Sequence, residues 1–225
     1  MSAPPSTPIR RSATPAAPAP RVGWVPIRSL AQRHRPLILA HLLALGDNDR
    51  YLRFGYAASD AQVRRYVDGI DFGRDEVVGI FDEALELVAV AHLAHIASAN
   101  GAAPMAEFGV SVLPRARGRG WGSRLFERAV LHARNWGADT MVIHALTENT
   151  PMLRIARKAG ARIERDGGEA QAMLRLPPED AGSRMDALVA QQAGEFDYQL
   201  KLQALRLQQW WRMMLPRAGA PSPAN

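Results

Sequence analysis

The sequence predicts an α/β protein of the α+β type, in which helices flank a mixed and mostly antiparallel central sheet. Runs with the two-residue alternation of strands occur between runs whose apolar residues recur every three or four positions, as on one face of a helix. Residues 77–81 and 85–95 form a strand pair with a turn at 82–84. Because strands, hairpins and helices are interspersed, a mixed sheet is favoured over a purely parallel one.

The other elements are expected in chain order around this pair. Further strands are predicted at 22–28, 106–112, 140–145 and 169–176. Helices are predicted at 35–45, 60–66, from the glycines near 120 to Trp136, and from Pro151 to a stop at Gly160.

One domain is predicted over 22–178, since the 225-residue chain is long enough to bury a sizeable core. Residues 1–21 are rich in Pro, Ala, Ser and Thr and contain arginines but no acid, which predicts a disordered basic arm. Residues 179–215 form a helical extension, with one long helical pattern from 185 to 215, and 216–225 are expected to be a disordered tail. The apolar stripe of the extension predicts packing on its own domain or a homodimer contact.

Composition restricts the classes of function. The chain has no cysteine, so it has neither disulfides nor thiolate metal sites, and we expect a cytoplasmic protein that holds no metal. It carries no apolar span of about 20 residues and no signal peptide. The net charge of +6 suits an acidic ligand, but no nucleic-acid module is recognisable, so no nucleic-acid partner is expected.

The segment from Phe108 to Ser123 is the most informative. It reads FGVSVLPRARGRGWGS, so a strand and a proline precede three glycines on the turn into a helix. The unpaired N–H groups at a helix N-terminus, together with the helix dipole, bind anions. Four nearby arginines add positive charge, and a phosphate-bearing ligand is therefore expected; they are Arg115, Arg117, Arg119 and Arg124.

The spacing of these residues resembles one phosphate-binding family. A Walker loop would need a Lys-Ser or Lys-Thr pair after the glycines, and a dinucleotide fingerprint would need G-x-G-x-x-G. The pattern R-x-x-G-x-G at Arg117, Gly120 and Gly122 resembles instead the pyrophosphate loop of the GNAT superfamily of N-acetyltransferases. Downstream, Asn149 and Gly160 match a second motif of that family.

The sequence around both motifs looks most like the catalytic domains of bacterial protein lysine acetyltransferases. Lys158 also matches the second motif, whereas Ala156 stands where the family often has a tyrosine and Ala161 where it often has a phenylalanine. That tyrosine protonates the departing thiolate in many family members, so here another group or water substitutes, or the step goes unassisted.

The resemblance implies a fold, a co-substrate and a reaction. Two neighbouring strands would splay and admit the pantetheine arm of acetyl-CoA, whose acetyl group would move to a primary amine, on a protein lysine or a small molecule, by direct attack in a ternary complex. The cofactor-binding residues it implies are Val110, Ser111, Val112, Arg117, Gly118, Arg119, Gly120, Trp121, Gly122, Ser123 and Asn149. A catalytically silent acyl-CoA sensor or scaffold is the alternative.

Acetyl transfer to an amine needs a proton acceptor, because a lysine-like ammonium with a pKa near 10.4 is almost entirely protonated at pH 7. Glu107 is the first candidate, since it stands in an otherwise apolar strand where burial would raise its pKa. A solvated edge carboxylate or an ion pair is equally compatible with this position. Glu148 is a weaker candidate that could instead cap the next helix. His41 and His144 are expected to be core residues.

Overall fold

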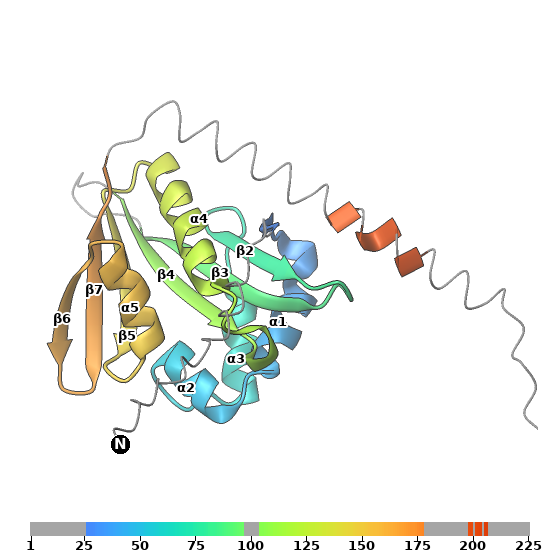
Figure 1. Ribbon diagram of the computed structural model, residues 1–225, viewed down its shortest axis with the longest axis horizontal. Helices are drawn as coiled ribbons and strands as arrows, with labels where there is room; N and C mark the ends of the chain where they lie inside the picture. The colour runs from blue at the N-terminus through green and yellow to red at the C-terminus, as the bar shows by residue number, and fades with distance from the viewer. Residues whose placement is uncertain (1–25, 97–103, 178–197, 200, 204, 207–225) are drawn as a thin grey trace, which may run out of the picture.

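The computed structural model describes residues 26–96, 104–177, 198–199, 201–203 and 205–206. Its centre is a seven-stranded sheet in the order β1-β2-β3-β4-β5-β7-β6 (Figure 1). The strands are β1 (Arg28–Ser29), β2 (Glu76–Phe81), β3 (Leu87–Ile96), β4 (Met105–Val112), β5 (Thr140–Leu146), β6 (Arg162–Asp166) and β7 (Glu169–Arg175). Every strand pair is antiparallel except β4 with β5, so the predicted mixed, mostly antiparallel sheet is confirmed.

The parallel pair of β4 and β5 is short. Their register begins at Met105 opposite Thr140 and ends at Glu107 opposite Val142. Beyond that point β4 stays paired with β3 as far as Val112, whereas β5 pairs with β7. Figure 1 shows the β5-β7-β6 group diverging from the rest of the sheet. The two central strands therefore splay apart, as the resemblance implied.

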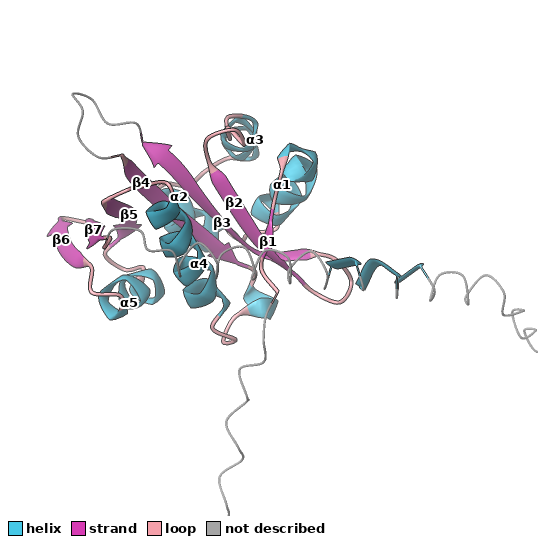
Figure 2. Cartoon of the chain, turned by 90° about the horizontal axis from the view of Figure 1, so that it is seen from above, coloured by secondary structure: helices cyan, strands magenta, loops and turns pink. Residues whose placement is uncertain are grey.

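Helices cover the two faces unequally. They are α1 (Arg35–Leu43), α2 (Asp47–Phe54), α3 (Asp60–Asp68), α4 (Trp121–Asn135) and α5 (Thr150–Lys158), with short 3-10 turns η1 (Gln32–His34) and η2 (Pro114–Ala116). Figure 2 shows α4 and α5 on one side of the sheet and α1 and α3 on the other. The helix α1 packs on β3, and α2 contacts β4 and β5. No described helix covers the α1 side of β6 and β7.

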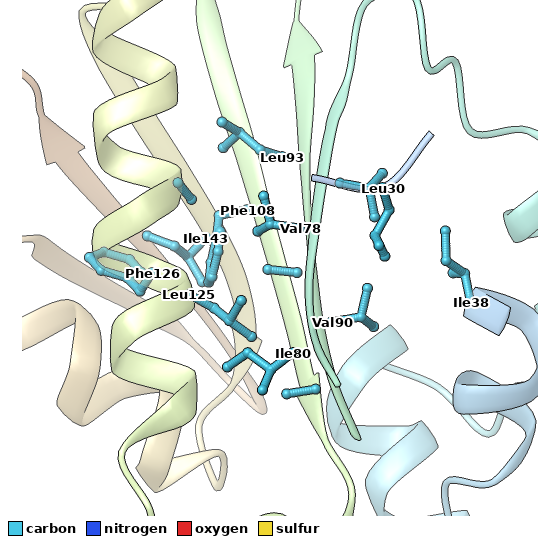
Figure 3. Packing of buried hydrophobic residues seen from close by; sticks show 14 of the residues in the cluster. Leu30, Ile38, Val78, Ile80, Val90, Leu93, Phe108, Leu125, Phe126 and Ile143 are labelled. Atoms are coloured by element: carbon cyan, nitrogen blue, oxygen red, sulfur yellow. The ribbon is translucent and has the colours of Figure 1, made fainter. Parts of the chain in front are cut away.

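The core lies on both faces of the β1–β4 half and continues onto β5 and β7, where Met141, Ile143 and Ala172 are buried. The ring of Phe126 on α4 meets Phe108 on β4 edge-on, with ring centroids 5.2 Å apart. Figure 3 shows these residues on one side of the sheet and Ile38 of α1 on the other. Phe108 and Ile38 are almost completely buried, as expected for apolar residues that alternate along strands or recur on one helix face.

Besides the two short 3-10 turns, one helix and one strand were not predicted. The helix α2 has almost no buried face, because its residues read DNDRYLRF and none of them is fully buried. The edge strand β6 has only Ile163 and otherwise charged, exposed residues, so it lacks the alternation of a half-buried strand. The first strand covers only Arg28–Ser29: residues 26–27 of the predicted strand are described and are not in a strand, and residues 22–25 lie outside the described residues.

The expected helix over 185–215 lies largely outside the described residues, as do 1–21 and 216–225. The described residues 198–199, 201–203 and 205–206 are helical. The ring of Tyr198 lies 5.1 Å from that of Phe81, and the guanidinium of Arg28 lies 3.7 Å from the Tyr198 ring. This part therefore packs on its own domain, and the homodimer contact stays a prediction. Among the described helices, none has both the length and the hydropathy to span a membrane.

Candidate active site

The glycine loop leaves a row of main-chain donors without acceptors. Gly118 and Gly120 have φ values of +76° and +75°, in the left-handed region that favours glycine, and α4 begins at Trp121. Within the described part of the chain, the N–H groups from Gly118 to Ser123 donate to no carbonyl or side chain. The first such bond belongs to Arg124, which donates to the carbonyl of Gly120 over 3.2 Å. The bend is therefore open and carries unpaired donors at a helix N-terminus.

The end of β4 presents its main chain toward the splay. The N–H of Leu113 donates to the carbonyl of Val88 on β3 over 2.9 Å. Because main-chain groups in an antiparallel ladder alternate between the two edges, those of Val110 and Val112 point the other way, toward β5. No β5 residue pairs with them, because the β4–β5 ladder ends at Glu107. Apart from the Val112 carbonyl, which accepts from Arg117 Nε over 3.2 Å, this edge is available to an extended ligand.

A cavity of about 530 Å³ joins the loop to this edge, and we call it the loop groove. Its walls are the start of α4, the end of β4, α2 and α5. Ten of the predicted cofactor-binding residues line it, namely Val110, Ser111, Val112, Arg117, Gly118, Gly120, Trp121, Gly122, Ser123 and Asn149. Arg119 does not, and its guanidinium lies 5.2 Å from the ring of Trp121.

The arginines near the loop have different partners. Arg117 donates through Nε to the carbonyl of Val112 over 3.2 Å, and its terminal nitrogen lies 2.6 Å from a carboxylate oxygen of Asp49 on α2. Arg115 pairs instead with Asp82 and Glu86 in the β2–β3 turn. The expectation that Arg115 adds positive charge around the loop is therefore wrong, because its charge is used to hold the hairpin.

Two residues of the loop groove also have structural roles. The hydroxyl of Ser111 donates to His41 Nε2 over 2.8 Å, while His41 Nδ1 donates to the carbonyl of Leu87 over 2.8 Å. Burial lowers the pKa of His41 to about 4, so it is neutral, and its predicted packing role is confirmed. Asn149 caps α5 by accepting from the N–H of Met152 over 3.2 Å.

A second, larger cavity of about 730 Å³ opens on the α1 side of the splay, and we call it the acceptor cavity. It shares Leu52, Arg53, Val110, Asn149 and Met152 with the loop groove, so the two spaces meet where β4 and β5 part.

The floor of the acceptor cavity is strongly polar. Strand register places Glu107, His144, Gln171 and Glu164 on one face of neighbouring strands. Four carboxylates line the cavity, those of Glu107, Glu164, Asp166 and Glu169.

The structure corrects several predictions about these side chains. Glu107 is exposed, so the burial that supported its choice as a base is absent. His144 is also exposed and lines the cavity, so its expected place in the core is wrong. Glu148 lines neither cavity, and Asn149 rather than Glu148 caps α5, so both readings of Glu148 lose their support.

A chain of hydrogen bonds in the cavity wall was not predicted from the sequence. The Arg53 guanidinium donates to the hydroxyl of Tyr66 over 2.6 Å, this hydroxyl lies 2.7 Å from His92 Nδ1, and His92 Nε2 lies 3.0 Å from a carboxylate oxygen of Asp75. A Cβ on Gly109 would come within 2.7 Å of the Arg53 guanidinium, so this glycine allows the arginine to lie flat on β4. No local motif signals a cluster drawn from separate elements.

Metal-binding groups are not found at either cavity. In the described ranges, no three or more His, Cys, Asp or Glu side chains are grouped as they would be to hold a metal ion. His92 faces Tyr66 on α3, whereas His95 meets Trp136 edge-on at the end of α4, so the two histidines lie on opposite faces of β3 and could not share a metal ion.

Comparisons with known proteins agree with this geometry. A family model described as the acetyltransferase (GNAT) family matches residues 48–161, and no curated protein matches. The GNAT domain of S. lividans PAT is 21% identical, with a TM-score of 0.57, over 67% of this chain and 89% of that one. The yncA protein of Salmonella typhimurium, solved with its cofactor acetyl-CoA, is 17% identical, with a TM-score of 0.52, over 71% and 98% of the two chains.

A ribosomal-protein-alanine N-acetyltransferase from Brucella melitensis is 15% identical, with a TM-score of 0.51, over 67% of this chain and 99% of that one. At these identities the solved structures share the fold alone. The family match covers just over half of the chain and contains the glycine loop, the splayed strands and α5. The chain belongs to the GNAT family of acetyltransferases.

Proposed function

We propose that the protein binds acetyl-CoA in the loop groove and transfers the acetyl group to a primary amine, which enters the acceptor cavity as an ammonium group and loses a proton before it attacks. The observation that carries the proposal is the row of unpaired N–H groups from Gly118 to Ser123, which opens into the groove beside the free edge of β4. An anion at this bend gains hydrogen bonds and the positive end of the α4 dipole.

Different residues of the loop groove would bind different parts of acetyl-CoA. The N–H groups of the loop would hold the diphosphate, and Arg117, which is paired with Asp49, would have to exchange that partner to contact it. The main-chain groups of Val110 and Val112 would pair with the pantetheine amides. Because β4 leads from the loop groove to the acceptor cavity, the thioester would come to the place where both cavities meet. A main-chain N–H of the splayed strand would stabilise the oxyanion that forms on attack.

The acceptor cavity favours a cation. Its four carboxylates outnumber the two arginines that also line it, Arg53 and Arg165, so it attracts an ammonium group more than a neutral or acidic acceptor. Glu107 is a candidate to take the proton of this ammonium, because it lies on the cavity floor next to the splay. The amine then attacks the thioester directly in a ternary complex, since the chain has no cysteine that could carry the acetyl group as a thioester.

A thiol-release assay with acetyl-CoA tests this function. Lysine amide, a lysine-rich peptide and spermidine represent cationic acceptors, and an acidic amino acid such as glutamate represents the disfavoured class. Release of CoA with a cationic acceptor, at a much higher kcat/KM than with glutamate, is expected. Transfer that prefers glutamate would refute the cationic acceptor.

One observation favours the alternative function, a catalytically silent acyl-CoA sensor or scaffold. Ala156, which stands where the family often has a proton-donating tyrosine, is completely buried and offers no proton to a thiolate. Tight binding of acetyl-CoA by calorimetry without thiol release from any amine would identify a sensor or scaffold. Ready turnover would exclude a catalytically silent protein. Such turnover is possible without the tyrosine, because a thiol with a pKa near 8.5 leaves without strong assistance.

A further inference from the structure

We propose that Tyr66 is a catalytic residue, which takes a proton from the bound ammonium group while its own hydroxyl proton passes to His92. The inference rests on the proposed function and assigns its proton acceptor. It differs from the assignment to Glu107, because the proton moves into the wall of the cavity rather than to a side chain exposed on its floor.

In the series of hydrogen bonds that joins Arg53, Tyr66, His92 and Asp75, the donors and acceptors can be assigned in one consistent way. A carboxylate only accepts, so His92 Nε2 carries a hydrogen and donates it to Asp75 over 3.0 Å. A neutral imidazole then has a bare Nδ1, which accepts from the Tyr66 hydroxyl over 2.7 Å. The guanidinium of Arg53 donates to the same phenol oxygen over 2.6 Å. The phenol hydrogen therefore points at a nitrogen that can receive it.

The hydrogen-bonded side chains are held in fixed orientations and reach the acceptor cavity. Asp75 is nearly buried and its other carboxylate oxygen accepts from the N–H of His95 over 3.1 Å, which fixes its orientation. The rings of Tyr66 and His92 meet edge-on with centroids 5.8 Å apart. Both residues and Arg53 line the acceptor cavity, and neither Tyr66 nor His92 lines the loop groove.

The surroundings of His92 keep its imidazole neutral, so that it can accept a proton. Burial lowers the pKa of His92, the hydrogen bond from its ring to Asp75 raises it, and the nearby charge of Arg53 lowers it. The charges of Asp75 and Glu107 raise it again, and the net shift is downward. His92 is therefore neutral near pH 7, and the carboxylate of Asp75 stabilises the imidazolium that forms when the proton arrives.

The reaction balances with this acceptor. The ammonium loses one proton to the phenol oxygen of Tyr66, and the phenol proton moves to His92 Nδ1, so the tyrosine is unchanged. The amine lone pair then forms the N–C bond and the C–S bond breaks. The second proton lost by nitrogen goes to the departing thiolate, which leaves as CoA-SH. The proton on His92 returns to water, and the net products are the amide, CoA-SH and one proton.

Steady-state kinetics against pH test the proposal on the full chain. Wild type, Tyr66→Phe and His92→Asn are assayed by thiol release with the best cationic acceptor. Tyr51→Phe and His95→Asn are the controls, because Tyr51 is exposed on α2 and His95 lies on the opposite face of β3. Calorimetry with acetyl-CoA and thermal unfolding check that each variant is folded, and we expect acetyl-CoA affinity to be unchanged.

Wild-type kcat/KM should fall on the acid side with a midpoint below the ordinary value for histidine. Tyr66→Phe and His92→Asn should lose about 100-fold or more in kcat. Their kcat/KM should rise about tenfold for each pH unit through neutrality, because only the unassisted free amine reacts. The controls should match wild type.

Three results separate the possible failures. If Tyr66→Phe keeps the wild-type rate and pH profile, the proton does not pass through Tyr66 and the inference is wrong. If Glu107→Gln alone removes the acid limb while Tyr66→Phe retains it, Glu107 is the base and the inference is again wrong. If folded wild type releases no thiol with any amine, the proposed function itself fails.

Discussion

Replacing Gly120 by aspartate should weaken acetyl-CoA binding far more than replacing it by asparagine. Gly120 has φ +75°, and no atom lies within 4 Å of the position that a Cβ would take. Asparagine and aspartate have the same shape and are the other residues that best tolerate the left-handed conformation. The backbone strain is therefore nearly equal in the two variants, and the difference between them reports the charge.

The size of the effect follows from Coulomb's law. A diphosphate held by the loop would place two negative charges about 5 Å from the new carboxylate, which repel it by about 1.7 kcal/mol at the permittivity of water. This energy corresponds to about 20-fold in Kd. Salt at about 0.15 M, where the Debye length is about 8 Å, roughly halves the energy.

Isothermal titration calorimetry with acetyl-CoA measures Kd for wild type and both variants at low and high salt. The Gly120→Asp variant should bind about 20-fold more weakly than Gly120→Asn at low salt, and the two should converge at about 1 M salt. Equal affinity at low salt, with both variants folded, would show that no diphosphate lies at this bend.

Three further predictions concern stability. Gly79→Ala should lower the free energy of unfolding by about 1–3 kcal/mol in urea titrations, because the new Cβ would lie 2.5 Å from a methyl carbon of Leu87. Buried His41 has its pKa lowered from 6.5 to about 4, so the unfolded state binds more protons between these values. The free energy of unfolding should therefore fall by up to about 3 kcal/mol, from this residue, as pH drops from 6.5 to 4. Asn149→Ala should lower the free energy of unfolding by about 1–2 kcal/mol, because the N-cap of α5, in which Asn149 accepts from the N–H of Met152, is lost.

Matched variants check each of these. Gly168→Ala has no neighbour within 4 Å of its Cβ and should be nearly neutral; a loss equal to that of Gly79→Ala would contradict the packing argument. A His41→Gln variant should lose less stability between pH 7 and 5 than wild type, and parallel pH curves would refute the titration. Asn149→Asp keeps the accepting oxygen but not the donor to Leu52, so its stability should lie between wild type and alanine.

The loop groove was largely predictable, because its chemistry is local in sequence. Three glycines spaced two apart, a preceding proline and a following apolar stripe require a turn into a helix wherever they occur. The open bend between Gly118 and Trp121 follows from that pattern alone. The partner of Arg115 was not predictable, because the acids that bind it belong to a hairpin more than 25 residues upstream.

The acceptor cavity was less predictable for the same reason. Arg53, Tyr66, Asp75 and His92 come from α2, α3, the segment before β2, and β3, and only the folded sheet brings them together. The choice of Glu107 as a buried base failed because its neighbours Ala106 and Phe108 are buried on the other face of β4, while its own side chain is exposed in the acceptor cavity.

The outer hairpin of β6 and β7 has a consequence for how this protein can diverge. Ala172 and Leu174 of β7 are buried in the core, while the more exposed Glu169 and Gln171 line the acceptor cavity. Each cavity-facing position on the ribbon can therefore be exchanged without disturbing the packed layer behind it. Amine preference can change one side chain at a time, and natural or laboratory selection for new acceptors should act first on this ribbon.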